Sequence, residues 1–92
     1  MIYSLPSAQT PLYNHPLPGI EAWLTDKGCR QDSDNLHVWW IEHDSWMAEL
    51  RLDIEELTVI YAVNGKRDTP VRRTFKYSLS REDIENAIFS GP

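Results

Sequence analysis

The stretch WWIEHDSW, residues 39–46, holds the side chains of this chain that are best suited to chemistry: three tryptophans, two acids and a histidine. A metal site or an acid–base pair requires such groups to converge on one point. On one strand, His37 and His43 would share a face but lie about 20 Å apart, at about 3.3 Å per residue. Glu42 and Asp44 fall on the opposite face from His43. We therefore expect no metal ion here.

The sequence also lacks catalytic motifs such as G-x-S-x-G, H-E-x-x-H or a glycine-rich phosphate loop. The acidic run DIEEL at 53–57 has the alternation of a strand and a turn. The single cysteine, Cys29, cannot form an internal disulfide, which indicates a reducing compartment. Without a cationic neighbour, Cys29 fits a buried apolar residue better than a reactive thiol. We expect no catalytic residues, no cofactor and no enzymatic activity.

The same tryptophan stretch fits the tip of a β-hairpin. A turn at Asp44 and Ser45 and a second tight turn at Glu55 and Glu56 give the strands a common phase, with all paired apolar residues on one face. A slip of one residue would turn every side chain to the other face, so the agreement of two hairpins supports both. The predicted pairs are Trp39–Leu50 and Ile41–Ala48, then Leu52–Val59, Leu50–Tyr61 and Ala48–Val63.

A fourth strand and two helices complete the predicted fold. Asn64-Gly65 is a turn signal, and the strand after it turns Val71, Phe75 and Tyr77 inward, with Arg73 on the same side, as on an edge strand. The segments PLPGIEAWLTDKGC (16–29) and LSREDIENAIFSG (79–91) have helical apolar spacing and terminal glycines. Their predicted buried residues are Ile20, Trp23 and Leu24 in the first helix and Ile84, Ala87 and Ile88 in the second, which Ser80 caps.

These elements predict one α+β domain over residues 18–92. We expect a four-stranded antiparallel meander with an N-terminal and a C-terminal helix on one face, in the order α-β-β-β-β-α. Residues 1–17 contain Pro6, Pro11 and Pro16 and are expected to form an extended proline-rich arm packed on the domain.

Trp40 points to the sheet face that the helices leave open, in a predicted row with Glu49, Ala62 and Arg72. Two interpretations remain open. Trp40 is either a lid packed under the proline-rich arm or over the Arg72 stem, or an anchor for a protein partner. The candidate partner surface consists of Val38, Trp40, Met47, Ile60 and Arg72.

Charge is unevenly distributed along the chain. Residues 32–56 hold eight acids and one base, whereas residues 66–81 hold six of the nine bases. Cross-strand pairing within one domain explains this split; the alternative is an anion or RNA contact through Arg67, Arg72, Arg73 and Lys76. The net charge of −5 argues against general nucleic-acid binding. No apolar run approaches the roughly 20 residues of a membrane span, and we expect a cytoplasmic monomer without a secretory signal.

Three segments resemble a small family of uncharacterised proteins found in cyanobacteria and in the plastids of algae and plants. They are TPLYNHPLPGIEAWL, LRLDIEELTVIYA and RRTFKYSLSREDIENAIFSGP. The resemblance implies a photosynthetic lineage, a soluble location and a role in assisting the assembly of a larger complex, with no catalytic residues to carry over. The expected function is a non-enzymatic protein-interaction module with an unidentified protein partner. The alternative is an RNA- or ribosome-binding protein that uses the basic segment 66–76.

Overall fold

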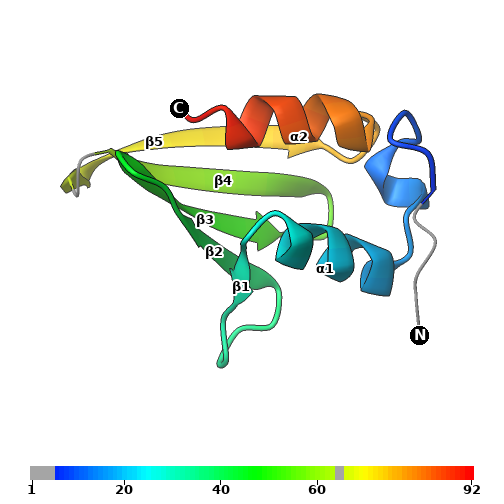
Figure 1. Ribbon diagram of the computed structural model, residues 1–92, viewed down its shortest axis with the longest axis horizontal. Coiled ribbons are helices and arrows are strands. Elements are labelled where there is room, and N and C mark those ends of the chain that lie inside the picture. The colour runs from blue at the N-terminus through cyan, green and yellow to red at the C-terminus, as the bar shows by residue number, and fades with distance from the viewer. Residues whose placement is uncertain (1–5, 64–65) are drawn as a thin grey trace.

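Five antiparallel strands form one meander sheet in the order β1-β2-β3-β4-β5, preceded and followed by a helix (Figure 1). The computed structural model describes residues 6–63 and 66–92. Side chains are described for residues 6–63 and 69–92. The elements are η1 (Leu12–Asn14), α1 (Leu17–Asp26), β1 (Arg30–Gln31), β2 (Val38–Glu42), β3 (Trp46–Leu52), β4 (Glu56–Val63), β5 (Lys66–Lys76) and α2 (Arg81–Phe89). The predicted α+β class and the antiparallel meander are confirmed.

The prediction of four strands was wrong because it missed β1. Arg30 and Gln31 pair with Trp40 and Trp39 of β2. Two residues carry no period that a pattern could detect. The short strand exists because a helix cap turns the chain back: Gly28 adopts a φ of +92° and donates to the carbonyl of Thr25 at 3.0 Å.

The first hairpin has the predicted register. Trp39 pairs with Leu50 and Ile41 with Ala48, and the amide of His43 donates to the carbonyl of Trp46 at 2.7 Å. The turn therefore lies at residues 44–45. Trp39 is 3% exposed and belongs to the core, as predicted.

The second hairpin has the predicted facing but not the predicted partners. Leu52 pairs with Leu57, and every pair is displaced by two residues from the predicted one. The prediction was wrong because the turn spans residues 53–55 and not a tight turn at 55–56. Asp53 accepts a hydrogen bond from the Thr58 hydroxyl at 3.2 Å, and Leu57 becomes fully buried. A shift of two leaves the face of each side chain unchanged.

β5 forms one edge of the sheet, as the charge on Arg73 predicted. Arg73 pairs with Val59 and Phe75 with Leu57, which places Arg73 on the side of the sheet that carries the core. The register changes between Tyr61 and Val63, opposite the part of β5 that contains Pro70. Proline cannot donate to a strand ladder, so such an irregularity suits it. The predicted Asn64-Gly65 turn lies outside the described residues.

One apolar core lies between the sheet and both helices. Trp23 and Leu24 of α1 and Ile84 and Ile88 of α2 belong to the same cluster as the inward residues of β2 to β5. Tyr61 links the layers, because its hydroxyl donates to the carbonyl of Ile88 at 2.7 Å. We call the side of the sheet that faces this core the inner face and the opposite side the outer face.

The proline-rich segment is not extended throughout, because Leu12–Asn14 form a turn of 3-10 helix. Leu12 is fully buried. The amide of Leu12 donates to the carbonyl of Leu79 at 2.9 Å, and the amide of Glu82 donates to the carbonyl of Ala8 at 2.8 Å. The described part of this segment, residues 6–16, therefore closes the end of the domain where β5 leads into α2 (Figure 1).

Candidate functional site

The outer face of the sheet carries one row of five side chains, one from each strand. The backbone register places them in the order Arg30, Trp40, Glu49, Ile60 and Arg72. Both helices contribute their buried residues to the inner face, so within the described chain the outer face carries no helix. Ile60 occupies the place predicted for Ala62, as the two-residue displacement of the second hairpin requires.

Trp40, the second residue of this row, is half-buried and is held by Asp32. Its indole N–H donates to Asp32 Oδ2 at 3.1 Å, while Asp32 Oδ1 accepts from the amide of Asp34 at 2.8 Å and of Asn35 at 3.1 Å. The hydrogen bonds from Asp34, Trp40 and Asn35 lower the pKa of Asp32. The sequence analysis did not single out Asp32. The signal that could have found it is the Asx turn, in which an aspartate side chain accepts from the backbone amide two residues later.

Two hollows flank Trp40. The first has a volume of about 210 Å³, and its lining includes Trp40, Met47, Glu49, Ile60, Ala62 and Pro70. The second, with a volume of about 480 Å³, is lined by Arg30, Gln31, Trp40, Glu42 and Met47. Because Trp40 and Met47 line both, they form a ridge between the two hollows. The first hollow is the more apolar of the two in its residue types.

The predicted partner surface is brought together in part. Trp40, Met47 and Ile60 line the first hollow, and Arg72 follows Ile60 in the row. Val38 shares the outer face but is only 3% exposed, so it offers a partner almost no surface. Pro70 was not among the predicted residues; it reaches the hollow because of the register change in β5.

The electrostatics of the row favour contacts through its two ends. Glu49 is paired with Arg51 at 2.5 Å, so its charge is already met within the chain. Arg30 and Arg72 are exposed and have no ion-pair partner among the described residues. The row therefore ends in an exposed arginine on each side, with Trp40 and Ile60 on either side of the Arg51-paired Glu49 between them.

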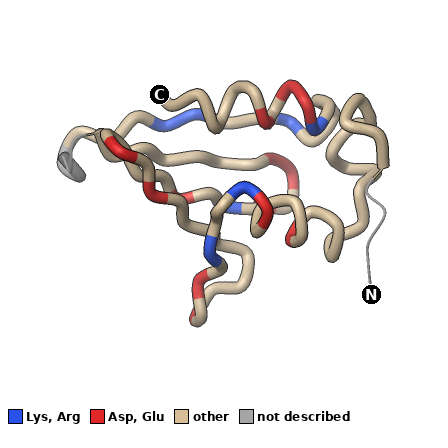
Figure 2. The backbone as a smooth tube through the Cα atoms, viewed as in Figure 1, with Lys and Arg blue, Asp and Glu red and all other residues tan. Residues whose placement is uncertain are grey.

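The predicted basic patch is divided between two faces. Arg72 and Lys76 lie on the outer face, whereas Arg73 lies on the inner face, with its guanidinium carbon 5.9 Å from the centroid of the Phe75 ring. The Arg67 side chain lies outside the described residues. Figure 2 shows the acids and bases along the backbone, with basic residues on β5 and acidic ones at the turns of β2 to β4.

Among the described residues, Cys29 and His43 have structural roles. Burial raises the pKa of the Cys29 thiol to about 11, so the buried thiol stays protonated. His43 stacks on Trp46 with ring centroids 4.9 Å apart. Among the described residues no three His, Cys, Asp or Glu side chains gather as metal ligands, and no helix there has the length and apolar character of a membrane span.

Comparison with curated proteins found no match, and comparison with solved structures found none either. A family model does match. It covers residues 27–91, which include all five strands and the whole of α2. The family is described as a protein of unknown function, DUF3143. The protein thus belongs to the DUF3143 family.

Proposed function

We propose that this protein is a non-enzymatic interaction module whose outer sheet face binds a protein partner. The observation that carries the proposal is the apolar hollow of about 210 Å³ beside Trp40, on a sheet face without a helix in the described chain. Large half-exposed aromatic residues in such hollows are frequent anchors of interfaces. The dimensions suit one or two apolar side chains of a partner.

The charges define the kind of partner segment. Arg30 and Arg72 lie at the two ends of the row and lack ion-pair partners in the described ranges, while Glu49 between Trp40 and Ile60 is paired with Arg51. A segment with a bulky apolar side chain between carboxylates complements this arrangement. Such complementarity contributes to the choice of partner and to the association rate more than to the affinity.

We further propose that the protein acts in a photosynthetic lineage and assists the assembly of a larger, photosynthesis-related complex. This part rests on the resemblance of the three quoted segments. It fits a small chain that lacks a ligand cluster for a metal among its described residues and offers an apolar docking surface.

RNA binding through β5 is the rival function, and the division of the basic residues argues against it. Phosphate contacts gain from bases that converge on one surface. Here Arg72 and Arg73 are neighbours in the chain but point to opposite faces of the sheet. The two residues therefore provide a matched pair of variants that separates the two functions.

The test compares Trp40→Ala and Arg72→Glu with Arg73→Glu and Ile54→Ala in quantitative affinity purification from the native organism. We expect the same partner to be lost by the first two variants and retained by the last two, with direct binding then measured on the purified partner. Trp40→Ala should weaken this binding by about tenfold or more, as for an anchor residue.

Two outcomes would contradict the proposal. A loss of several kcal/mol in the free energy of unfolding of Trp40→Ala would make Trp40 a core residue. Equal loss of binding for Arg72→Glu and Arg73→Glu, together with a mobility shift of structured RNA at low salt, would favour the RNA function instead.

A further inference from the structure

A second surface lies at the end of the sheet where the β3–β4 turn approaches the N-terminal segment. Three of its residues are unusually exposed for large apolar side chains: Ile54 at 99%, Tyr13 at 64% and Leu17 at 58%. Single exposed apolar residues are ordinary on protein surfaces. Tyr13 and Leu17 come from the N-terminal segment and Ile54 from the distant β3–β4 turn, and the hollows that they line meet at one end of the sheet.

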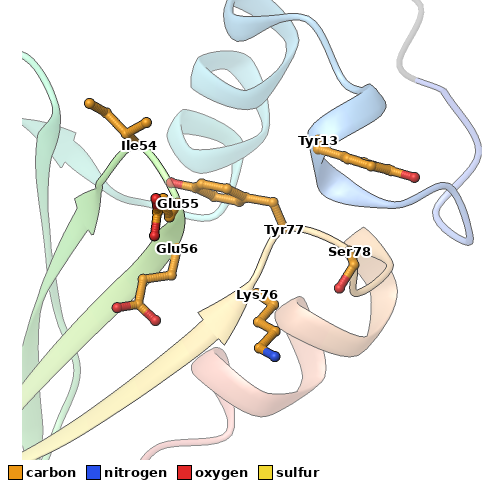
Figure 3. Close-up of a pocket in the computed structure, with 7 residues that line it drawn as sticks. All are labelled: Tyr13, Ile54, Glu55, Glu56, Lys76, Tyr77 and Ser78. Atoms are coloured by element: carbon orange, nitrogen blue, oxygen red, sulfur yellow. The ribbon is translucent and has the colours of Figure 1, made fainter.

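Tyr77 holds this end together. Its hydroxyl donates to the backbone carbonyl of Asp53 in the turn, while its own carbonyl accepts from the amide of Tyr13 at 3.0 Å. Figure 3 shows the Tyr77 side chain reaching toward the turn, with Tyr13 on the other side. Burial, with the charges of Asp53 and Glu56, raises the pKa of Tyr77 to about 12, so the hydroxyl stays a donor. The surface is thus built on fixed backbone contacts.

Two hollows make the surface continuous. The larger, of about 480 Å³, is lined by Tyr13, Ile54, Glu55, Glu56, Lys76, Tyr77 and Ser78 (Figure 3). The second, of about 240 Å³, has Leu17, Ile20, Leu52 and Asp53 in its lining together with the same two tyrosines. We call the combined region the sheet-end surface, defined by Tyr13, Leu17, Asp53, Ile54, Glu55, Glu56 and Tyr77.

The rim of the sheet-end surface is acidic. Asp53 and Glu55 flank Ile54 in the turn, Glu56 follows as the first residue of β4, and all three acids are exposed. Figure 2 shows acidic residues where β3 turns into β4. Lys76 is the one lysine or arginine that lines either hollow among the described residues. Exposed isoleucine inside an acidic rim favours a ligand that brings both apolar surface and positive charge.

We infer that the sheet-end surface binds a basic protein segment that carries bulky apolar side chains, such as an amphipathic helix with leucine and lysine faces. The acidic rim disfavours nucleic acid and anionic lipid by charge repulsion. A second copy of this chain is also disfavoured, because a two-fold contact would set the same acids against each other. The hollows of this surface share no lining residue with the two hollows beside Trp40, so this inference is independent of the function proposed above.

The first experiment titrates the isotope-labelled full chain with a synthetic amphipathic helical peptide of leucine and lysine. The control is the same peptide with glutamate at every lysine position. We expect amide shifts confined to residues 13–17, 53–56 and 76–78 for the lysine peptide, weakening as salt screens the exposed charges. Equal shifts with both peptides, shifts centred on Trp40 and Ile60, or no shift at millimolar peptide would each overturn the inference.

Variants then test the surface directly. Ile54→Asp should weaken binding of the lysine peptide by about tenfold, and so should the double variant Glu55→Lys, Glu56→Lys. The matched controls are Leu36→Asp, another exposed apolar position at 66%, and Glu42→Lys, another exposed acid. Because Ile54 is 99% exposed, its substitution leaves the core intact.

Equal weakening by test and control variants would overturn the assignment of this surface. So would concentration-dependent self-association in sedimentation that Ile54→Asp abolishes, because a second copy would then be the occupant. The Trp40→Ala variant should bind the peptide as the unmodified chain does. The outer-face function can therefore fail while this inference stands, and the reverse.

Discussion

Trp39 and Trp40 are adjacent in the chain and lie in opposite environments. Trp39 is 3% exposed beneath the helices, whereas Trp40 lies on the outer face and donates to Asp32. The alternation of side chains along a strand is enough to predict this difference from the sequence. The Asp32 contact is not predictable in this way, because it depends on how the loop before β2 folds back.

His15 illustrates a residue whose role sequence reasoning did not detect. It is 5% exposed, and its Nε2 lies 3.3 Å from the Thr10 carbonyl, which can only accept, so Nε2 carries the hydrogen. Its Nδ1 is buried without a partner among the described residues. Burial and the charge of Arg81 lower the pKa of His15 below its ordinary 6.5, and the contact with Thr10 opposes this shift in part. The fold therefore favours the neutral imidazole.

A pH dependence of stability follows from this lowered pKa. As the pH falls below about 6.5, the unfolded chain takes up a proton at His15 before the folded chain does. The free energy of unfolding should decrease through this window, with a slope below about 1.4 kcal/mol per pH unit. Urea denaturation at pH 7.5 and 5.5 should show a smaller decrease for His15→Gln than for the unmodified chain. Identical pH dependence in both would contradict this role.

The helices and the first hairpin are the elements that local sequence determines. Ser80 caps α2 as predicted, since its hydroxyl accepts from the amide of Asp83 at 3.1 Å. The second hairpin is different, because turns that differ in length by two residues place the same apolar residues of β3 and β4 on the inner face. Alternation specifies the face but not the partner, and the longer turn was selected by the contacts of Asp53 with Thr58 and Tyr77.

The cap of α2 can be tested by substitution. Ser80→Ala removes the acceptor for the Asp83 amide, and we expect a loss of about 1 kcal/mol in the free energy of unfolding. The control is Ser90→Ala at the other end of α2, where the hydroxyl only donates to the Asn86 carbonyl at 2.8 Å. That change should stay within about 0.5 kcal/mol. Urea denaturation of both variants checks the prediction, and equal losses would contradict it.

At the scale of the whole molecule, Glu85 joins the two helices. It accepts from the Trp23 indole at 2.8 Å and pairs with Lys27 at 3.1 Å. Burial alone would raise the pKa of Glu85, but the bonds from Trp23 and Lys27 and the nearby positive charges lower it. Pairing of residues this distant in the chain is not predictable from periodicity. The sheet-end surface escaped prediction for the same reason, because it combines a turn with a segment far away in the sequence.

Removing the Glu85 carboxylate should weaken the contact between the helices. We expect Glu85→Ala to lower the free energy of unfolding at pH 7 by about 1–2 kcal/mol, since the Trp23 N–H loses its acceptor. Lys27→Ala removes only the partly exposed ion pair and should cost less than about 1 kcal/mol. In the unmodified chain this stabilisation should disappear as the pH falls through the lowered pKa of Glu85. Equal losses in the two variants would show that the indole bond contributes nothing.

The unequal placement of the tryptophans has a practical consequence. Of the four in the chain, Trp23, Trp39 and Trp46 are at most 9% exposed, and Trp40 is the half-buried one. A collisional quencher such as iodide therefore reaches the fluorescence of Trp40 before that of the others. Shielding from iodide would report occupancy of the outer face without any label, while a ligand at the opposite end of the strands would leave the emission quenched as before.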